Sequence, residues 1–119
     1  MALTVLIVDD HPTFRKFARR LLEEGGFAVV GEAQDGVTAV AVERHLRPAV
    51  VLLDVLLPDR SGLDVASTLA EVPDAPVVVL TSSRSARDLG SALKEAPAHG
   101  FIPKAGFTAA AFAELLGRP

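Results

Sequence analysis

Short runs of Val, Leu and Ile alternate along the chain with longer segments in which apolar residues recur at helical spacing. The runs lie at 3–8, 27–31, 49–53, 76–81 and 100–102. The first, third and fourth are almost continuous, as is typical of strands buried on both faces of a parallel sheet. The pattern predicts five strands, each followed by a helix.

The segment after the first run has the clearest helical pattern, with an apolar face opposite a charged one. The apolar residues are Phe14, Phe17, Ala18, Leu21 and Leu22. Pro12 suits the first turn of this helix, and Gly25-Gly26 marks its end. Weaker patterns predict four further helices, over 36–46, 62–71, 86–95 and 108–116.

The five strand-then-helix units have short connections and fill a chain of 119 residues, which is the size of one domain. They predict an α/β fold over residues 1–119, a flavodoxin-like doubly wound parallel sheet with strand order 2-1-3-4-5 and five helices. In such a sheet, ligands bind at the carboxyl ends of the strands, where the first and third strands meet.

Acidic residues follow both of those strands. Asp9 and Asp10 end the first run, and Asp54 ends the third; Thr81 and Lys104 end the fourth and fifth. Carboxylates beside buried strands are costly unless a cation offsets their repulsion. The topology therefore predicts one pocket for a hard cation, Mg²⁺ or alternatively Mn²⁺, and for a phosphoryl group.

The other metal-binding residue types predict no further site. The chain has no cysteine, which excludes thiolate ligands and disulfides. Its three histidines, at 11, 45 and 99, have no ligand spacing, so we expect surface positions for them.

Charge and hydropathy indicate where the chain acts. The net charge of −3 has no concentrated basic patch, so we expect no direct nucleic-acid binding. No basic leader precedes the first run, and no run approaches the about 20 residues of a membrane helix. These features predict a cytoplasmic chain with no membrane contact.

Four motifs occur in the order and spacing of a known family. They are Val-Asp-Asp-His-Pro (8–12), Leu-Leu-Asp-Val-Leu-Leu-Pro-Asp-Arg-Ser-Gly (52–62), Val-Leu-Thr-Ser-Ser (79–83) and Gly-Phe-Ile-Pro-Lys-Ala (100–105). Together they resemble the bacterial response-regulator receiver domain of two-component systems. The His-Pro after the acidic pair and the Pro-Lys-Ala sequence resemble the NarL/LuxR-type subfamily most.

The resemblance implies that Asp54 is the phosphoacceptor, which takes a phosphoryl group from a phosphohistidine or a small phosphodonor. It implies that Asp10 and Asp54 ligate Mg²⁺ directly. Asp9 would act largely through water, and the backbone carbonyl of Leu56 would add a ligand. The reaction of such a domain is limited to its own phosphorylation and dephosphorylation.

The same resemblance implies a switch around the acceptor. Lys104 would pair with Asp54 at rest and with a phosphoryl oxygen afterwards. The Thr81 hydroxyl and the Ser82 N–H would bind the phosphoryl group, and Phe101 would be the switch aromatic that follows Thr81. The surface of helix 86–95, the fifth strand and the last helix would then signal to an output.

The resemblance also implies one partner. The basic face of the first helix, Arg15-Lys16-Arg19-Arg20, would meet the cognate histidine kinase, although such a face can also be simply solvated. The last helix carries Glu114 as its only charge, so Ala109, Ala113 or Leu116 could be covered by a second copy or an output partner. The chain could be a stand-alone receiver, which the lack of a linker favours, or the N-terminal part of a DNA-binding transcription regulator.

Gly90 lies inside the predicted helix 86–95. A glycine there weakens a helix by about 1 kcal/mol relative to alanine. We therefore expect this helix to be the mobile element that responds to phosphorylation.

Each of these residues also has an ordinary alternative. Asp10 and Thr81 could cap the helices that follow them, and Asp54 could be a turn residue. Lys104 could be a solvated lysine at a strand end, and Phe101 a core residue.

Rival functions fit the motifs less well. A haloacid-dehalogenase-type phosphatase needs a second carboxylate two residues after the nucleophile, where this chain has Leu56. A flavodoxin needs a phosphate-binding loop rich in Ser, Thr and Gly after the first strand, where Asp9 and Asp10 would repel a phosphate. A degenerate receiver would have lost part of the acidic set, which this chain retains.

Overall fold

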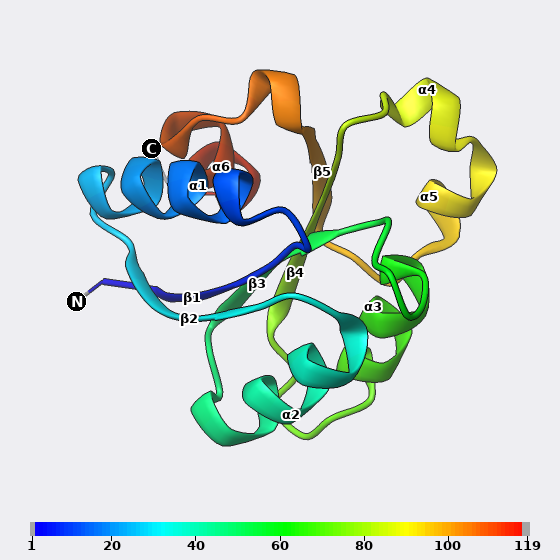
Figure 1. Cartoon of the computed structure of the whole chain (residues 1–119), viewed down its shortest axis with the longest axis horizontal. Helices are drawn as coiled ribbons and strands as arrows, with labels where there is room; N and C mark the ends of the chain where they lie inside the picture. Colours follow the sequence, from blue (N-terminus) through cyan, green and yellow to red (C-terminus); the bar gives the residue numbers. More distant parts are fainter. Residues whose placement is uncertain (1, 118–119) are drawn as a thin grey trace.

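A parallel five-stranded sheet forms the centre of the computed structural model, which describes residues 2–117 (Figure 1). The strands are β1 (Thr4–Val8), β2 (Ala28–Ala33), β3 (Val50–Asp54), β4 (Val77–Ser82) and β5 (Gly100–Pro103). Their order is β2-β1-β3-β4-β5, and all neighbours are parallel. The flavodoxin-like strand order predicted from the sequence is confirmed.

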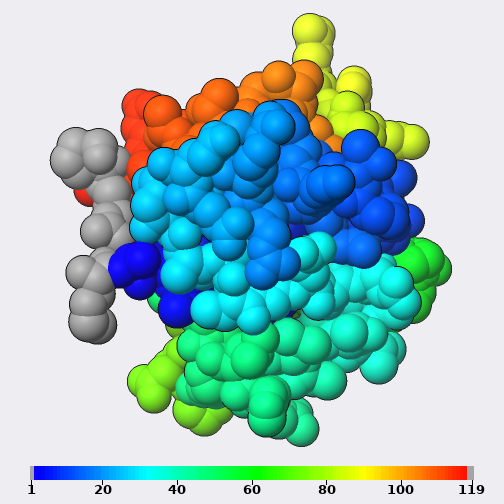
Figure 2. Space-filling view, turned by 60° about the vertical axis from the view of Figure 1, so that its left-hand side comes forward, coloured from blue at the N-terminus to red at the C-terminus, as the bar shows by residue number. Residues whose placement is uncertain are grey.

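Helices cover both faces of the sheet (Figure 1). One face carries α1 (Pro12–Glu24) and α6 (Ala109–Leu115), which lie side by side in Figures 1 and 2. The other face carries α2 (Gly36–Leu46), α3 (Gly62–Ala70), α4 (Ala86–Leu89) and α5 (Ser91–Glu95). The sheet is therefore the middle of three layers.

Alternation along β1 creates a separate core on each face. Val5 and Ile7 pack in the cluster that includes Leu22 of α1 and Phe112 of α6. Leu6 and Val8 pack in the cluster that includes Ala39 of α2 and Val65 of α3. Successive side chains of a strand point to opposite faces, so a strand that is apolar throughout can serve both cores.

The ends of α1 follow the sequence signals. The helix begins with Pro12 in its first turn, and His11 is the N-cap residue without a side-chain bond. Asp10 therefore does not cap this helix. Gly25 ends the helix, and Gly26 has a φ of 92°, which glycine adopts readily.

The expected single helix over 86–95, and with it the count of five helices, is corrected by the structure. Residues 2–117 contain six α-helices and a short 3-10 helix, η1 (Lys104–Gly106). Gly90 separates α4 from α5, with φ 69° and ψ −155°. This conformation is essentially restricted to glycine, so Gly90 breaks the helix instead of only weakening it.

The residues proposed as an outer face of α6 contact the chain itself. Ala109 approaches Gly25 so closely that a Cβ there would lie 2.5 Å from the Ala109 Cβ. Ala113 and Leu116 pack against the buried cluster that includes Leu22 of α1. An intermolecular role for α6 thus stays a prediction. Among the helices that the structure describes, none is long and apolar enough to span a membrane.

Candidate functional site

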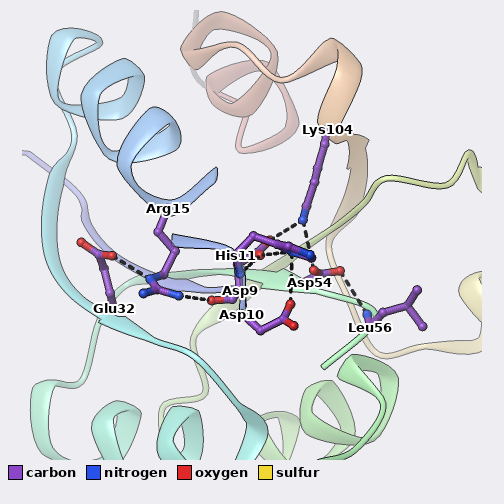
Figure 3. A network of polar contacts seen from close by, with 8 residues as sticks. All are labelled: Asp9, Asp10, His11, Arg15, Glu32, Asp54, Leu56 and Lys104. Carbon is purple, nitrogen blue, oxygen red and sulfur yellow. Dashed lines mark hydrogen bonds and ion pairs between the residues drawn. The ribbon is translucent and has the colours of Figure 1, made fainter. Parts of the chain in front are cut away.

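The carboxyl ends of β1, β3 and β4 and the start of η1 bring the predicted residues to one edge of the sheet. Asp9 and Asp10 follow β1, and Asp54 is the last residue of β3. Thr81 on β4 is paired in register with Asp54. Lys104 extends from η1 over the carboxylates (Figure 3). Parallel strands present their carboxyl ends on a common edge, which is why residues so distant in sequence meet here.

Lys104 joins two of the carboxylates. Its Nζ lies 2.6 Å from Oδ2 of Asp9 and 3.1 Å from Oδ2 of Asp54 (Figure 3). The ammonium also lies 4.6 Å from the centre of the Phe14 ring, within the range of a cation–π interaction. Lys104 is thus a half-buried ion-pair partner, not a solvated strand-end lysine.

Asp54 is nearly buried, with 2% of the residue exposed. Its second oxygen, Oδ1, accepts a hydrogen bond of 3.0 Å from the N–H of Leu56. Burial raises the pKa of the Asp54 carboxyl above its ordinary value of 3.8, and the negative charge of Asp9 acts in the same direction. The Leu56 N–H and the Lys104 ammonium oppose this rise without cancelling it.

The pKa of Lys104 is raised, although burial alone would lower it. Burial lowers the pKa of the ammonium, but the close contact with Asp9 and the charge of Asp54 together raise it above 10.5. The lysine is therefore held in its charged form by two carboxylates, and one positive charge faces two negative ones.

The carboxylates fit a divalent cation. Oxygens of Asp9, Asp10 and Asp54 lie, together with a ring nitrogen of His11, within 4.8 Å of one another. Oδ2 of Asp9 is buried, and the Lys104 ammonium lies 2.6 Å from it. Three carboxylates therefore share one ammonium, and a hard cation with oxygen ligands would stabilise the remaining excess of negative charge.

The switch residues lie around this pocket but do not all face it. Thr81 is buried, and its hydroxyl donates a hydrogen bond of 2.7 Å to the carbonyl of Ile102 on β5. The Ser82 hydroxyl accepts from the N–H of Arg84. Phe101 is half-buried and lines a cavity of about 220 Å³ beside α5. The helix that follows β4 is capped by Ser85, not by Thr81.

Two of the basic residues named from the sequence contact the acidic pair, which the sequence pattern did not predict. Nδ1 of His11 lies 3.0 Å from Oδ1 of Asp9, so this histidine is not only a surface residue. Arg15 donates a hydrogen bond of 2.6 Å to the carbonyl of Asp9 and pairs with Glu32 on β2 (Figure 3). Both residues lie within six positions of Asp9 in the sequence, and this short spacing could have indicated the contacts.

The loop between β3 and α3, which carries Leu56, is anchored to α2. The carboxylate of Asp59 accepts hydrogen bonds from the N–H groups of Gly36 (2.8 Å) and Val37 (3.0 Å). The bond from Gly36 is the main reason that the pKa of the Asp59 carboxyl is lowered. A carboxylate is favoured at the positive end of a helix, so this contact holds the loop in place.

Gly62 packs directly against the backbone of Asp54 and Val55. A Cβ at this residue would collide with the backbone carbonyl oxygen of Asp54 and lie 2.8 Å from the Cα of Val55. We predict that Gly62→Ala lowers the free energy of unfolding by about 1–3 kcal/mol, because rigid backbone must move. Chemical denaturation measures this change. Gly106→Ala is the matched control, since its Cβ meets nothing within 4 Å; equal stability of the two variants would contradict the prediction.

Comparisons with known proteins agree with this geometry. The family model of the response regulator receiver domain matches residues 5–114. The nitrate/nitrite response regulator protein NarP of Escherichia coli is 40% identical over 102 residues, which are 84% of this chain and 47% of NarP. A protein-glutamate methylesterase/protein-glutamine glutaminase of Hahella chejuensis is 39% identical over 86% of this chain and 30% of its own length.

A solved structure extends the match over almost the whole chain. The signal receiver domain of the response regulator NarL from Mycobacterium tuberculosis superposes with a TM-score of 0.84 and 30% identity, over 98% of both chains. The chain spans less than half of the length of the two curated relatives above. With the fold, the site and these matches in agreement, the chain belongs to the family of response regulator receiver domains, and NarL/LuxR-type regulators are among its relatives.

Proposed function

We propose that Asp54 accepts a phosphoryl group from a histidine kinase in a Mg²⁺-dependent reaction. The observation that carries this proposal is the environment of its carboxylate. One oxygen contacts Lys104, the other accepts from Leu56, and the carboxylates of Asp9 and Asp10 lie beside it. Phosphoryl transfer depends mainly on positioning and charge neutralisation, which such a pocket supplies.

In this reaction, an oxygen of the ionised Asp54 carboxylate attacks the phosphorus of the donor. A new O–P bond forms as the bond between phosphorus and the donor imidazole nitrogen breaks, and the imidazole leaves with that electron pair. Lys104 moves from Asp54 to a phosphoryl oxygen. Hydrolysis of the acyl phosphate later restores the carboxylate, so the chemistry of the domain is confined to its own phosphorylation and autodephosphorylation.

The cation would be held by oxygen atoms of this chain. Asp10 and Asp54 are proposed as direct ligands, Asp9 as a ligand through water, and the backbone carbonyl of Leu56 as a further ligand. Bound Mg²⁺, or Mn²⁺ in its place, would neutralise charge on the phosphoryl oxygens. The grouping of the Asp9, Asp10 and Asp54 oxygens within 4.8 Å of one another supports this assignment.

The response to phosphorylation would begin at Thr81. Its hydroxyl would leave the Ile102 carbonyl and donate to a phosphoryl oxygen, aided by the N–H of Ser82. Phe101 would follow Thr81, with the adjacent cavity giving its ring room to move. The surface of α4, α5, β5 and α6 would thereby change, and the break at Gly90 supports a mobile α4–α5 segment.

Partners follow from the same proposal. The kinase would dock on α1, whose residues Lys16 and Arg20 are exposed. A second copy or an output partner would use the α6 region. Relatives such as NarP are response regulators, which supports signalling to an output domain or partner. We propose that this output is transcription regulation in the cytoplasm and that this chain itself does not bind nucleic acid.

Incubation with acetyl phosphate tests the proposal. With excess Mg²⁺ we expect intact-mass spectrometry to show one added phosphoryl group, which base hydrolyses as it does an acyl phosphate. With EDTA in place of Mg²⁺ we expect no modification. Equal modification under both conditions would contradict the metal-dependent mechanism.

A further inference from the structure

A ring nitrogen of His11 lies between the two acidic side chains that precede it (Figure 3). Its Nδ1 is 3.0 Å from Oδ1 of Asp9 and 3.2 Å from Oδ1 of Asp10. The side chain is 65% exposed, and although His11 is the N-cap of α1, its ring makes no capping bond. The imidazole is therefore not required to begin the helix.

The position of Nδ1 indicates that this nitrogen donates a hydrogen atom to the carboxylates or shares a cation with them. The backbone N–H of His11 already donates to Oδ1 of Asp9 at 2.8 Å. If Nδ1 carried only its lone pair, that pair would face two negative oxygens. A proton on Nδ1 removes this repulsion, and a metal ion that takes the place of the proton would do the same while the ring proton moves to Nε2.

The four ligand atoms are grouped for such an ion. One atom each from Asp9, Asp10, His11 and Asp54 lies within 4.8 Å of the others. Atoms bound to one transition-metal ion at about 2.0–2.2 Å can be up to about 4.4 Å apart, so a shift of a few tenths of an ångström completes the shell. Imidazole favours Ni²⁺, Zn²⁺ and similar ions, whereas Mg²⁺ prefers oxygen.

We propose that His11 is a direct ligand when the acidic pocket binds a borderline transition-metal ion such as Ni²⁺, which gives the pocket a preference for such ions over Mg²⁺. The inference rests on the proposed cation site, to which it adds one nitrogen ligand. The pocket then has a mixed set of ligands. Its three carboxylates contribute to the binding of any divalent cation, whereas the imidazole adds affinity only for transition-metal ions.

Calorimetric titration of tag-free protein with NiCl₂ and with MgCl₂, at one fixed pH and ionic strength, tests the proposal. We expect His11→Gln to lower the ratio of Ni²⁺ to Mg²⁺ affinity by at least about 10-fold. His99→Gln is the matched control, because His99 is an exposed histidine of the loop before β5, and it should leave the ratio unchanged. Asp10→Asn should weaken both ions, because they share the pocket.

The outcomes separate this inference from the proposed function. If His11→Gln leaves the ratio unchanged, or if Ni²⁺ affinity survives Asp10→Asn, His11 is not a ligand in this pocket and the inference fails, whatever Mg²⁺ does. If the wild-type protein binds Ni²⁺ through His11 and Asp10 but takes up no Mg²⁺, the inference stands and the proposed Mg²⁺-dependent function fails.

Discussion

Asp54→Asn is expected to abolish phosphorylation by acetyl phosphate, lowering the rate by at least about 10³-fold, as loss of the nucleophile does in enzymes. Asparagine keeps the size of the side chain but has no carboxylate oxygen to attack phosphorus. Because burial raises the pKa of Asp54, a neutral side chain suits this position, and we expect the variant to remain folded. Intact-mass spectrometry measures the phosphorylated fraction over time.

Asp64→Asn is the control for this experiment. Asp64 is an exposed aspartate in the first turn of α3, and its replacement should leave phosphorylation unchanged. A phosphoryl group that still forms on Asp54→Asn at the wild-type rate would show that another residue is the acceptor. The thermal transition of each variant distinguishes loss of the nucleophile from loss of the fold.

Among the substitutions proposed for this protein, Lys104→Met is expected to lower the free energy of unfolding the most when no metal ion is present. The ammonium is the charge that Asp9 and Asp54 share, and their side chains are only 1% and 4% exposed. Removing one partner of a buried ion pair costs about 3–5 kcal/mol, because uncompensated charge remains. Denaturant unfolding in EDTA measures the loss. Excess Mg²⁺ should reduce it, since the cation would offset the same carboxylates.

The pH dependence of this loss has a definite sign. Asp54 has a raised pKa when folded, so its contribution to stability is present at low pH and is lost as pH rises through that pKa. Lys104 also has a raised pKa, so its contribution is lost only at alkaline pH. The difference between wild type and Lys104→Met should thus be largest between these two pKa values and should shrink in acid.

Lys16→Met controls for the loss of a lysine, because Lys16 is exposed on α1. Its stability should differ from that of the wild type by less than about 0.5 kcal/mol. If Lys104→Met is as stable as this control in EDTA at neutral pH, the two carboxylates do not depend on Lys104.

Local patterns were sufficient for the strands and their order. Continuous apolar runs are what a sheet covered on both faces requires, and few topologies join five strand-helix units with short connections. The grouping of Asp9, Asp54 and Lys104 followed from that order, because each residue ends a strand or follows one directly. The break between α4 and α5 did not follow, because helical spacing on both sides of Gly90 does not reveal its backbone angles.

The sequence by itself therefore determined the sheet, its two cores and the edge at which acidic, hydroxyl and ammonium groups meet. Only the tertiary structure decided how these groups are used at rest: that the Thr81 hydroxyl donates to Ile102, and that Nδ1 of His11 lies between two carboxylates. The physical reason is that periodicity specifies which face of an element is buried. Side-chain rotamers and hydrogen-bond partners depend instead on atoms that other segments of the chain bring within a few ångströms.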